Sequence, residues 1–402
     1  MSELLDELLR RTHLSAPSDL AAVVADQAVA SLGARDVALY VADYELKTLM
    51  PLAASHTDEP EPLAIAGTVA GRAYATTSIL RSSPDSAHER IWVPMLDGTE
   101  RVGMMGLTFA AGAITERIVA ACERYAHLVA ILIVAKSAYG DFFQVSRRRK
   151  PMTIASELLW GLAPPLVFAT DLLVLAAMLE PSYDNGGDAL DYALNGQMLD
   201  LAVFDAMGHG LAAAGVAAFA LAAYRQSRRS GLGLLDTYAA MDDAVGSQFP
   251  GDRFVTAVIA QLELDTGRLT WISAGHPAPL LIRGGRRARM LDALPAPPLG
   301  IQVAHAPPVV ATESLEPGDL LLLYTDGLTE ARDPHGTMLT VEGLAEFIER
   351  EAHAGQTTPE TLRRLRQAII TSPRANLRDD ATALLLEWRR GGERDLLPQT
   401  VA

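Results

Sequence analysis

Along the first 140 residues, the spacing of apolar and polar positions predicts a helix, then strands and then a long helix. Residues 20–32 carry apolar side chains at helical spacing, which predicts a helix with one buried face. Four segments show the apolar patterns of strands: Val37–Ala42, Leu46–Leu52, Ile91–Met95 and Val102–Phe109. The stretch Gly67–Ser86 separates the two pairs of strands. The pattern predicts a mixed domain of helices and strands in this part of the chain.

A long helix follows, in which apolar residues recur every three or four positions. These residues are Ile114, Ile118, Ala121, Tyr125, Leu128, Leu132, Ala135 and Tyr139. The spacing is a heptad pattern, which is typical of paired helices, although a helix packed on its own domain can show it too. Two alternatives follow: a parallel homodimer through the 114–139 helix, or a core helix. Pro151 ends the helical region because proline lacks the amide donor.

From residue 152 onward, an amphipathic helix over Met152–Leu162 precedes short apolar segments alternating with helices. Strands are predicted at Leu172–Leu179, Leu199–Phe204, Phe254–Leu264, Leu269–Ala274, Leu280–Arg283, Leu320–Tyr324 and Ala383–Trp388. Helices are predicted at Leu211–Arg228, Gly233–Ser247, Val341–Ala352 and Pro359–Thr371. Strands in runs with helices in pairs predict an α+β fold, an α-β-β-α sandwich in which two sheets pack face to face and helices cover the outside.

Composition narrows the class of protein. A chain of 402 residues predicts two domains. The formal charge of −15 argues against a nucleic-acid-binding face, and we interpret the short basic run Arg147–Lys150 as a solvated connection, with contact to a partner or the next domain as the alternative. The single cysteine, Cys122, is expected to be buried, and no signal segment opens the chain. The apolar stretch Leu211–Tyr224 is too short to span a bilayer. We expect a cytoplasmic protein without a membrane span.

Four acidic motifs lie at strand ends or in tight turns. They are Gly186-Gly187-Asp188, Asp205-Ala206-Met207-Gly208-His209-Gly210, Tyr324-Thr325-Asp326-Gly327 and Asp379-Asp380-Ala381-Thr382. One such motif alone is usually a turn. Four together indicate compensating cations, because clustered carboxylates repel each other and lose hydration. Oxygen ligands favour Mg²⁺ or Mn²⁺, and two such ions can activate one water molecule for attack on phosphorus.

The order and spacing of these motifs resemble the SpoIIE/RsbU type of the metal-dependent type-2C (PPM) phosphatases. The resemblance includes Ala274–Pro277 (Ala-Gly-His-Pro) and Pro317–Leu320 (Pro-Gly-Asp-Leu), and it covers about residues 152–389. It implies a serine/threonine phosphatase with two Mn²⁺ or Mg²⁺ ions. The implied substrate is a phosphorylated STAS-domain protein, an anti-sigma factor antagonist that controls a sigma factor in stress response.

The resemblance also implies roles for the site residues. Asp205 is expected to bridge the two ions, and the carbonyl of Ala206 to bind one of them. Asp188 is expected to hold one ion directly or through water. Asp326 and Asp379 are expected to hold the other ion, with Asp380 as the alternative to Asp379. The glycines expected to shape the turns near the site are Gly186, Gly187, Gly208, Gly210 and Gly327.

Two features depart from the eukaryotic members of the superfamily, which have a histidine general acid and an arginine that binds phosphate. His209 is spaced differently from the bridging aspartate, so it is either a candidate general acid or a helix-start residue near the site. No arginine flanks the first motif as theirs does. His276 is expected to be a turn residue, and Asp191 and Tyr192 are expected to orient the first motif.

The first domain resembles a GAF domain in its element order, which implies either a sensory role or a domain that only dimerises. The expected organisation is a GAF-like domain over 1–140, a linker and switch helix over 141–165, a phosphatase domain over 166–390 and a disordered tail over 391–402. The alternative function is a catalytically weak dimeric scaffold that sequesters a regulatory partner. A nucleotidase is disfavoured because the chain lacks a phosphate-cradling Gly-x-x-x-x-Gly-Lys loop.

Overall fold

The structure of the protein is a computed structural model. It describes residues 2–52, 60–251, 253–284, 287–301, 307–331, 338–370, 379–388 and 396–397. The chain divides into two compact units: unit 1 comprises Met1–Lys150 with Arg394–Ala402, and unit 2 comprises Pro151–Glu393. Of the predicted tail over 391–402, all but Leu396 and Leu397 lie outside the described residues.

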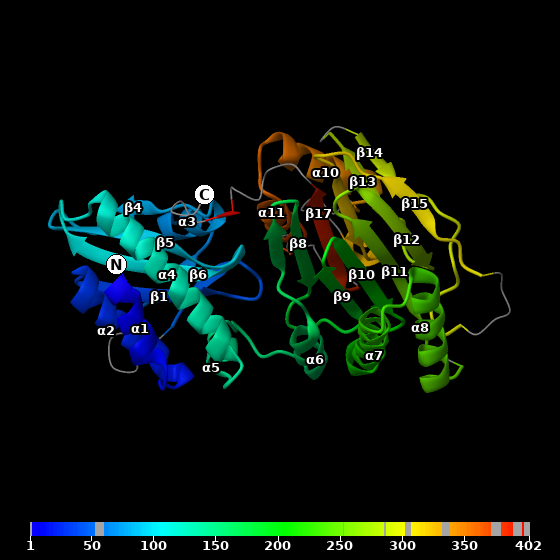
Figure 1. The fold of residues 1–402 in the computed structure, drawn as a ribbon, viewed down its shortest axis with the longest axis horizontal. Coiled ribbons are helices and arrows are strands. Elements are labelled where there is room, and N and C mark those ends of the chain that lie inside the picture. The colour runs from blue at the N-terminus through cyan, green and yellow to red at the C-terminus, as the bar shows by residue number, and fades with distance from the viewer. Residues whose placement is uncertain are drawn as a thin grey trace. The chain divides into compact units, whose positions relative to one another are not determined.

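Unit 1 is built on a six-stranded antiparallel sheet with the order β3-β2-β1-β6-β5-β4 (Figure 1). Its strands are β1 (Asp36–Ala42), β2 (Thr48–Pro51), β3 (Leu63–Ala64), β4 (Leu80–Ser82), β5 (His88–Asp97) and β6 (Glu100–Ala110). Its helices are α1 (Ser2–Thr12), the 3-10 helix η1 (Pro17–Asp19), α2 (Leu20–Leu32), α3 (Val69–Ala75), α4 (Glu116–Ser137) and α5 (Phe142–Ser146). Helices α2 and α4 pack on one face of the sheet and α3 on the other. The predicted strands and the two predicted helices are confirmed, whereas α1, α3 and α5 were not predicted.

Helix α4 belongs to the core of unit 1. Cys122 and Val129 are fully buried, and the buried hydroxyl of Tyr125 donates to the carbonyl of Val24 at 2.8 Å. Among the described helices, α4 is long and apolar enough in length and composition to cross a membrane. Its apolar face is nevertheless occupied by contacts with the sheet and with α2. Packing within the unit therefore accounts for the apolar character of α4.

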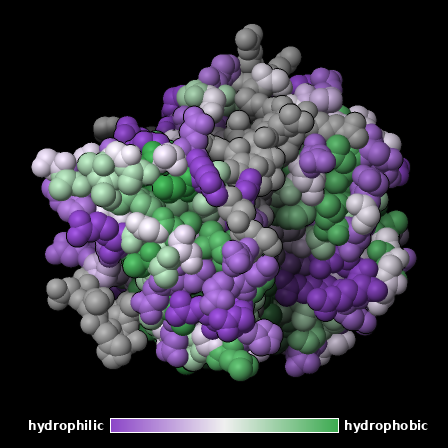
Figure 2. Space-filling model, turned by 60° about the vertical axis from the view of Figure 1, so that its left-hand side comes forward, coloured by the Kyte–Doolittle hydropathy of each residue, from purple (hydrophilic) through white to green (hydrophobic). Residues whose placement is uncertain are grey.

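The heptad positions of α4 divide between the core and the surface. Ile114, Ala121 and Tyr125 are buried inside unit 1, so these positions follow the core-helix alternative. Apolar side chains are exposed toward the end of the helix, where Ile131 is 41% and Val134 is 42% exposed. Hydrophobic residues also reach the surface on the face of the molecule shown in Figure 2, interspersed with hydrophilic ones.

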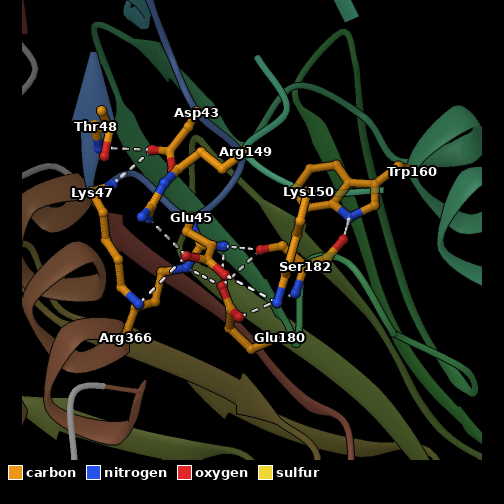
Figure 3. Close-up of polar contacts among 10 residues, drawn as sticks. All are labelled: Asp43, Glu45, Lys47, Thr48, Arg149, Lys150, Trp160, Glu180, Ser182 and Arg366. Carbon is orange, nitrogen blue, oxygen red and sulfur yellow. Dashed lines mark hydrogen bonds and ion pairs between the residues drawn. The ribbon is translucent and has the colours of Figure 1, made fainter. Parts of the chain in front are cut away.

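The basic run Arg147–Lys150 is held by the turn between β1 and β2. Nε of Arg147 donates to the carbonyl of Ala42 at 2.9 Å. Nη1 of Arg149 lies 3.3 Å from a carboxylate oxygen of Glu45 and 3.7 Å from one of Asp43 (Figure 3). Arg149 and Lys150 are exposed, as expected for a solvated connection, and the run also makes these ion pairs with the turn of unit 1.

Unit 2 has four layers, with two antiparallel sheets between helices (Figure 1). The first sheet, in the order β15-β12-β11-β10-β9, contains β9 (Asp188–Asn195), β10 (Met198–Ala206), β11 (Val255–Glu263), β12 (Arg268–Ala274) and β15 (Ala311–Ser314). The second, in the order β14-β13-β16-β17-β8-β7, contains β7 (Val167–Thr170), β8 (Leu173–Glu180), β13 (Leu280–Arg283), β14 (Arg287–Met290), β16 (Leu320–Tyr324) and β17 (Ala381–Trp388). The helices of unit 2 are α6 (Ile154–Leu162), α7 (Gly210–Arg229), α8 (Leu234–Gln248), α9 (Asp326–Glu330), α10 (Val341–His353) and α11 (Thr358–Ile370).

The layers follow from which side chains each strand buries. Leucines of both sheets, such as Leu175 and Leu201, fill the space between the sheets. Helices α7 and α8 cover the outer face of the first sheet, and α10 and α11 cover that of the second. The predicted α+β class is confirmed, and so are the predicted strands and helices of this unit. Strands β7, β9, β14 and β15 were not predicted, since none of them contains a long apolar run.

A buried ion pair joins α11 to the end of β8, and a hydrogen bond joins α11 to the segment that follows. Arg366 contacts both the carboxylate of Glu180 and the hydroxyl of Ser182 (Figure 3). Arg366 is 1% and Glu180 is 2% exposed, so the two charges are shielded from water. Nε1 of Trp160, on α6, donates to the carbonyl of Ser182 at 2.8 Å. The segment fixed in this way leads directly into the first acidic motif.

Candidate active site

Two of the predicted aspartates lie opposite each other on adjacent strands. Asp188 is the first residue of β9, and the register of the sheet pairs it with Asp205 on β10. Residues paired directly across an antiparallel ladder point to the same face, with Cβ atoms about 4.5–5.5 Å apart. Leu201 and Val203 share that face of β10 and fill the space between the sheets. The two carboxylates therefore lie at the end of the inter-sheet core.

Thr325 connects three of the four acidic motifs. Its hydroxyl donates to Oδ2 of Asp188 at 2.7 Å and accepts the amide of Thr382 at 2.9 Å. The amide of Thr325 donates to the carbonyl of Thr382 at 3.0 Å. Thr325 was not predicted as a site residue. The sequence signal that could have identified it is a hydroxyl residue that directly follows the buried apolar run Leu320–Tyr324.

Asp379 and Asp380 have different roles in the structure. Oδ2 of Asp380 accepts the amides of Gly186 at 2.8 Å and Gly187 at 2.6 Å. Asp380 is buried, whereas Asp379 is exposed and its Oδ1 accepts the amide of Asp380 at 2.9 Å. The carboxylate of Asp380 is thus committed to holding the first motif in place. Asp379 is the member of the pair whose carboxylate is accessible.

Glycine is required by close backbone contacts at two positions in the site. A Cβ atom on Gly327 would lie 2.0 Å from the carbonyl oxygen of Asp380, and one on Gly186 would lie 2.3 Å from the amide nitrogen of Gly210. No side chain fits into either contact. The turn that leads from Asp205 into α7 also contains two glycines with positive φ, 96° at Gly208 and 73° at Gly210. The predicted turn glycines therefore bring the motifs together.

Burial and mutual repulsion raise the pKa of the clustered carboxylates. Burial raises the pKa of Asp205 to about 7, and the charges of Asp326, Asp379 and Asp380 add to the rise. Burial, followed by the charges of Asp205 and Asp380, holds the pKa of Asp188 well above its usual range. Burial and the charge of Asp379 raise the pKa of Asp326. The predicted acidic residues therefore form one electrostatically coupled cluster.

The donor chemistry of this cluster fits divalent cations. All of its side-chain donors are oxygen atoms, which Mg²⁺ and Mn²⁺ prefer, and a cation among them would offset the repulsion that raises their pKa values. In the described part of the chain, no three His, Cys, Asp or Glu side chains already converge as ligands of one ion. Oδ2 of Asp380 already accepts two backbone amides of the first motif. The remaining carboxylates of the cluster are the ones that could hold an ion.

The two histidines of the motifs differ in accessibility. His209 is the N-cap residue of α7 and is exposed, and its ring makes no hydrogen bond to the residues that the structure describes. His276 is 7% exposed, with Nδ1 at 2.9 Å from Oγ1 of Thr256. Burial lowers the pKa of His276 to about 4, so this histidine is neutral at physiological pH. The position of His276 in a buried turn agrees with its predicted role as a turn residue.

Asp191 and Tyr192 hold β9 in place. Asp191 lies three residues after Asp188, so its side chain points to the other face of the strand. There it pairs with Arg225 and Arg228 of α7 at 2.7 and 2.8 Å. The hydroxyl of Tyr192 donates to the carbonyl of Pro165 at 2.8 Å. Both residues support the strand that positions Asp188, as the sequence predicted, and Asp191 faces away from the acidic cluster.

Comparisons with known proteins agree with the motifs. Residues 195–389 match the family model described as Stage II sporulation protein E (SpoIIE). These residues, which make up most of unit 2, form a SpoIIE domain. The SpoIIE domain is accordingly a phosphoprotein phosphatase domain of the PP2C type, and this family is metal-dependent.

Several known proteins are similar to parts of the chain. Phosphoserine phosphatase RsbU of Bacillus subtilis is 22% identical over 269 residues, which are 65% of this chain and 79% of RsbU. Protein IcfG of Synechocystis is 26% identical over 137 residues, 34% of this chain and 21% of IcfG. The crystal structure of the RsbU and RsbW domains of a Mycobacterium tuberculosis protein is 29% identical, with a TM-score of 0.47. That match covers 54% of this chain and 60% of the mycobacterial chain.

The hydroxyl of Thr325 is expected to matter for activity in the SpoIIE domain. Thr325→Val should lower kcat/KM for an aryl phosphate by about 10–100-fold, the range for residues that orient metal ligands. Thr325→Ser keeps the hydroxyl that donates to Asp188 and should stay close to wild type. Steady-state kinetics with Mn²⁺ measures both variants, and thermal unfolding checks that they fold. Equal activity of the folded valine and serine variants would contradict this role.

Proposed function

We propose that the SpoIIE domain hydrolyses phosphoserine or phosphothreonine in a small STAS-domain protein, an anti-sigma factor antagonist, and thereby controls a sigma factor. The observation that carries the phosphatase chemistry is the pairing of Asp188 with Asp205 across β9 and β10, electrostatically coupled to Asp326 and Asp379. The similarity to RsbU, named a phosphoserine phosphatase, supports the substrate class.

Two Mn²⁺ or Mg²⁺ ions are the proposed cofactors. Asp205 would contribute to holding both ions, and the carbonyl of Ala206 would bind one of them. Asp188 would hold one ion, and Asp326 and Asp379 the other. Asp380 keeps its bonds to the amides of the first motif and acts as a positioning residue. Bound ions of this kind supply a water molecule acidic enough to act as a nucleophile at neutral pH. His209 is the candidate general acid because its ring is exposed and because it follows Asp205 by four residues.

A protein substrate suits the surface around the site. Met207 lies on the turn that follows Asp205 and is 48% exposed, and Leu211 lies in the first turn of α7 and is 54% exposed. Large apolar side chains exposed beside a charged site are typical of surfaces that bind another protein. A small phosphate ester would leave both side chains in water. A folded phosphoprotein would cover them.

Chelation is expected to stop the phosphatase reversibly. Oxygen-only sites exchange Mg²⁺ and Mn²⁺ with solvent, so EDTA should abolish hydrolysis of phosphorylated STAS-domain proteins and added Mn²⁺ should restore it. The measurement is phosphate release from a panel of such substrates, with the unphosphorylated proteins as the control. Restoration by Zn²⁺ alone would contradict the proposed ion chemistry. Binding of the partner without phosphate release would instead favour the sequestering scaffold.

Helix α6 is proposed as the switch element in the predicted 141–165 segment. The hydroxyl of Ser156, which is fully buried, accepts the amide of Asn185 at 2.7 Å. The amide of Thr153 donates to the carbonyl of Tyr183 at 3.0 Å. Asn185 directly precedes Gly186 of the first acidic motif. A shift of α6 would therefore move the turn that carries Asp188, which would bias the site between competent and incompetent states.

We propose that unit 1 is a GAF-like sensory domain that forms a homodimer in the cytoplasm. Its order of helix, two strands, middle segment, two strands and long helix supports the GAF resemblance. The exposed residues Ile131 and Val134 on α4, with Tyr139 just beyond it at 82% exposed, support the dimer surface. Light scattering should give a dimer for the wild type and a monomer for Ile131→Glu/Val134→Glu. A monomeric wild type with normal activity would rule out control of the phosphatase through dimerisation of unit 1.

A further inference from the structure

An arginine from the neighbouring strand lies beside the turn that begins at Asp205. The register of β10 and β11 pairs Ala206 with Val255, and the amide of Met207 donates to the carbonyl of Phe254 at 3.0 Å. One residue further along this ladder, Arg253 lies next to Gly208. Nη1 of Arg253 is 3.6 Å from the position that a Cβ atom on Gly208 would occupy. The guanidinium group is thus placed against a turn without a side chain.

Arg253 is not used to neutralise the aspartates. The charged groups that shift the pKa values of Asp188, Asp205 and Asp326 are all carboxylates. The side chain of Arg253 is half-buried. It forms no hydrogen bond or ion pair with any residue that the structure describes. Residue 252 is not among the described residues. Its donors are therefore available for an incoming anion beside the turn that follows Asp205.

A phosphate monoester needs such a partner. The substrate brings a dianion toward a cluster of negative side chains, and the planar guanidinium group can donate two parallel hydrogen bonds to two phosphate oxygens. We propose that Arg253 binds the phosphate group of the substrate. In the eukaryotic members of the superfamily an arginine near the first motif has this role, and this chain has no arginine there. This inference rests on the proposed phosphatase function. It places the phosphate between the acidic cluster and the Gly208 turn.

The test compares Arg253→Ala and Arg253→Lys with the wild type. The assays are Mn²⁺-dependent hydrolysis of p-nitrophenyl phosphate and its inhibition by inorganic phosphate. The alanine variant is expected to raise both KM and the inhibition constant of phosphate by roughly 10–100-fold, the range for a lost hydrogen bond to a charged group. The lysine variant should recover only part of the loss, because lysine supplies a charge without the planar fork. Added guanidinium ion should partly restore the alanine variant.

Arg268→Ala is the matched control. Arg268 pairs with Glu263 at the opposite end of β11, so its loss should change neither constant. Thermal unfolding reports whether each variant folds, and the lysine variant keeps the test valid if the alanine variant does not. An unchanged inhibition constant for phosphate in folded Arg253 variants would overturn the role of Arg253 and leave the phosphatase intact. A wild type that neither hydrolyses the ester nor binds phosphate would overturn both.

Discussion

Asp205→Asn is expected to reduce Mn²⁺-dependent phosphatase activity by more than about a hundredfold, beyond the loss typical for residues that merely orient a metal ligand. Asp205 lies opposite Asp188 and is coupled to three further carboxylates, so its loss would remove the proposed link between the two ions. The measurement is phosphate release from a phosphoprotein and from an aryl phosphate. Substantial turnover by the folded variant would contradict the assignment of the site.

The same substitution is expected to stabilise the metal-free protein. The pKa of Asp205 is raised to about 7 in the folded state, so its ionisation destabilises the fold as the pH rises through 7. At pH 8 in EDTA, the neutral asparagine should therefore raise the unfolding midpoint, and Mn²⁺ should add less stability than in the wild type. Asp200→Asn is the control, because Asp200 lies on the other face of β10 and bonds to Gln261 at 2.9 Å.

Arg366→Met is expected to destabilise unit 2 by about 3–5 kcal/mol, the cost of leaving one charge of a buried pair without its partner. Glu180 is 2% exposed, and burial raises its pKa even with Arg366 beside it. Without Arg366, the carboxylate and the hydroxyl of Ser182 would lose their shared donor. Urea unfolding measures the change in the free energy of unfolding.

The double variant Glu180→Gln/Arg366→Met tests the cause of that loss. If the uncompensated charge of Glu180 is responsible, removing the charge as well should recover most of the stability. Exposed Arg350→Met on α10 is the matched control and should change stability by less than about 0.5 kcal/mol. A double variant as unstable as the single one would show that packing around Arg366, rather than its charge, stabilises unit 2.

Hydrophobic periodicity along the sequence was sufficient to predict the main elements. The buried strands of unit 2, such as Leu320–Tyr324, have continuous apolar runs, and α7 has a long alanine-rich pattern. These signals are local, because each segment must bury its own apolar side chains whatever its neighbours are. The acidic motifs are also local, and their order along the chain was enough to indicate the SpoIIE family.

The position of Asp188 could not be predicted in the same way. Strand β9 contains no long apolar run and lies at the edge of its sheet, so its pattern resembles a loop. Its pairing with β10 places Asp188 opposite Asp205. The heptad pattern of α4 was similarly ambiguous, because a core helix and a paired helix bury apolar residues at the same spacing.

The sequence by itself determined the main elements, the acidic residues and the likeness of the C-terminal part to the SpoIIE family. Only the tertiary structure decided how the acidic residues differ from one another. Asp380 bonds to the amide of Gly187, which is 193 residues away in the chain, and Asp379 is left accessible. Thr325 likewise bonds to Asp188 and Thr382, which are distant from it in the sequence. The reason is physical: a carboxylate's role depends on which donors and charges surround it, and those arrive from segments that are distant in the sequence.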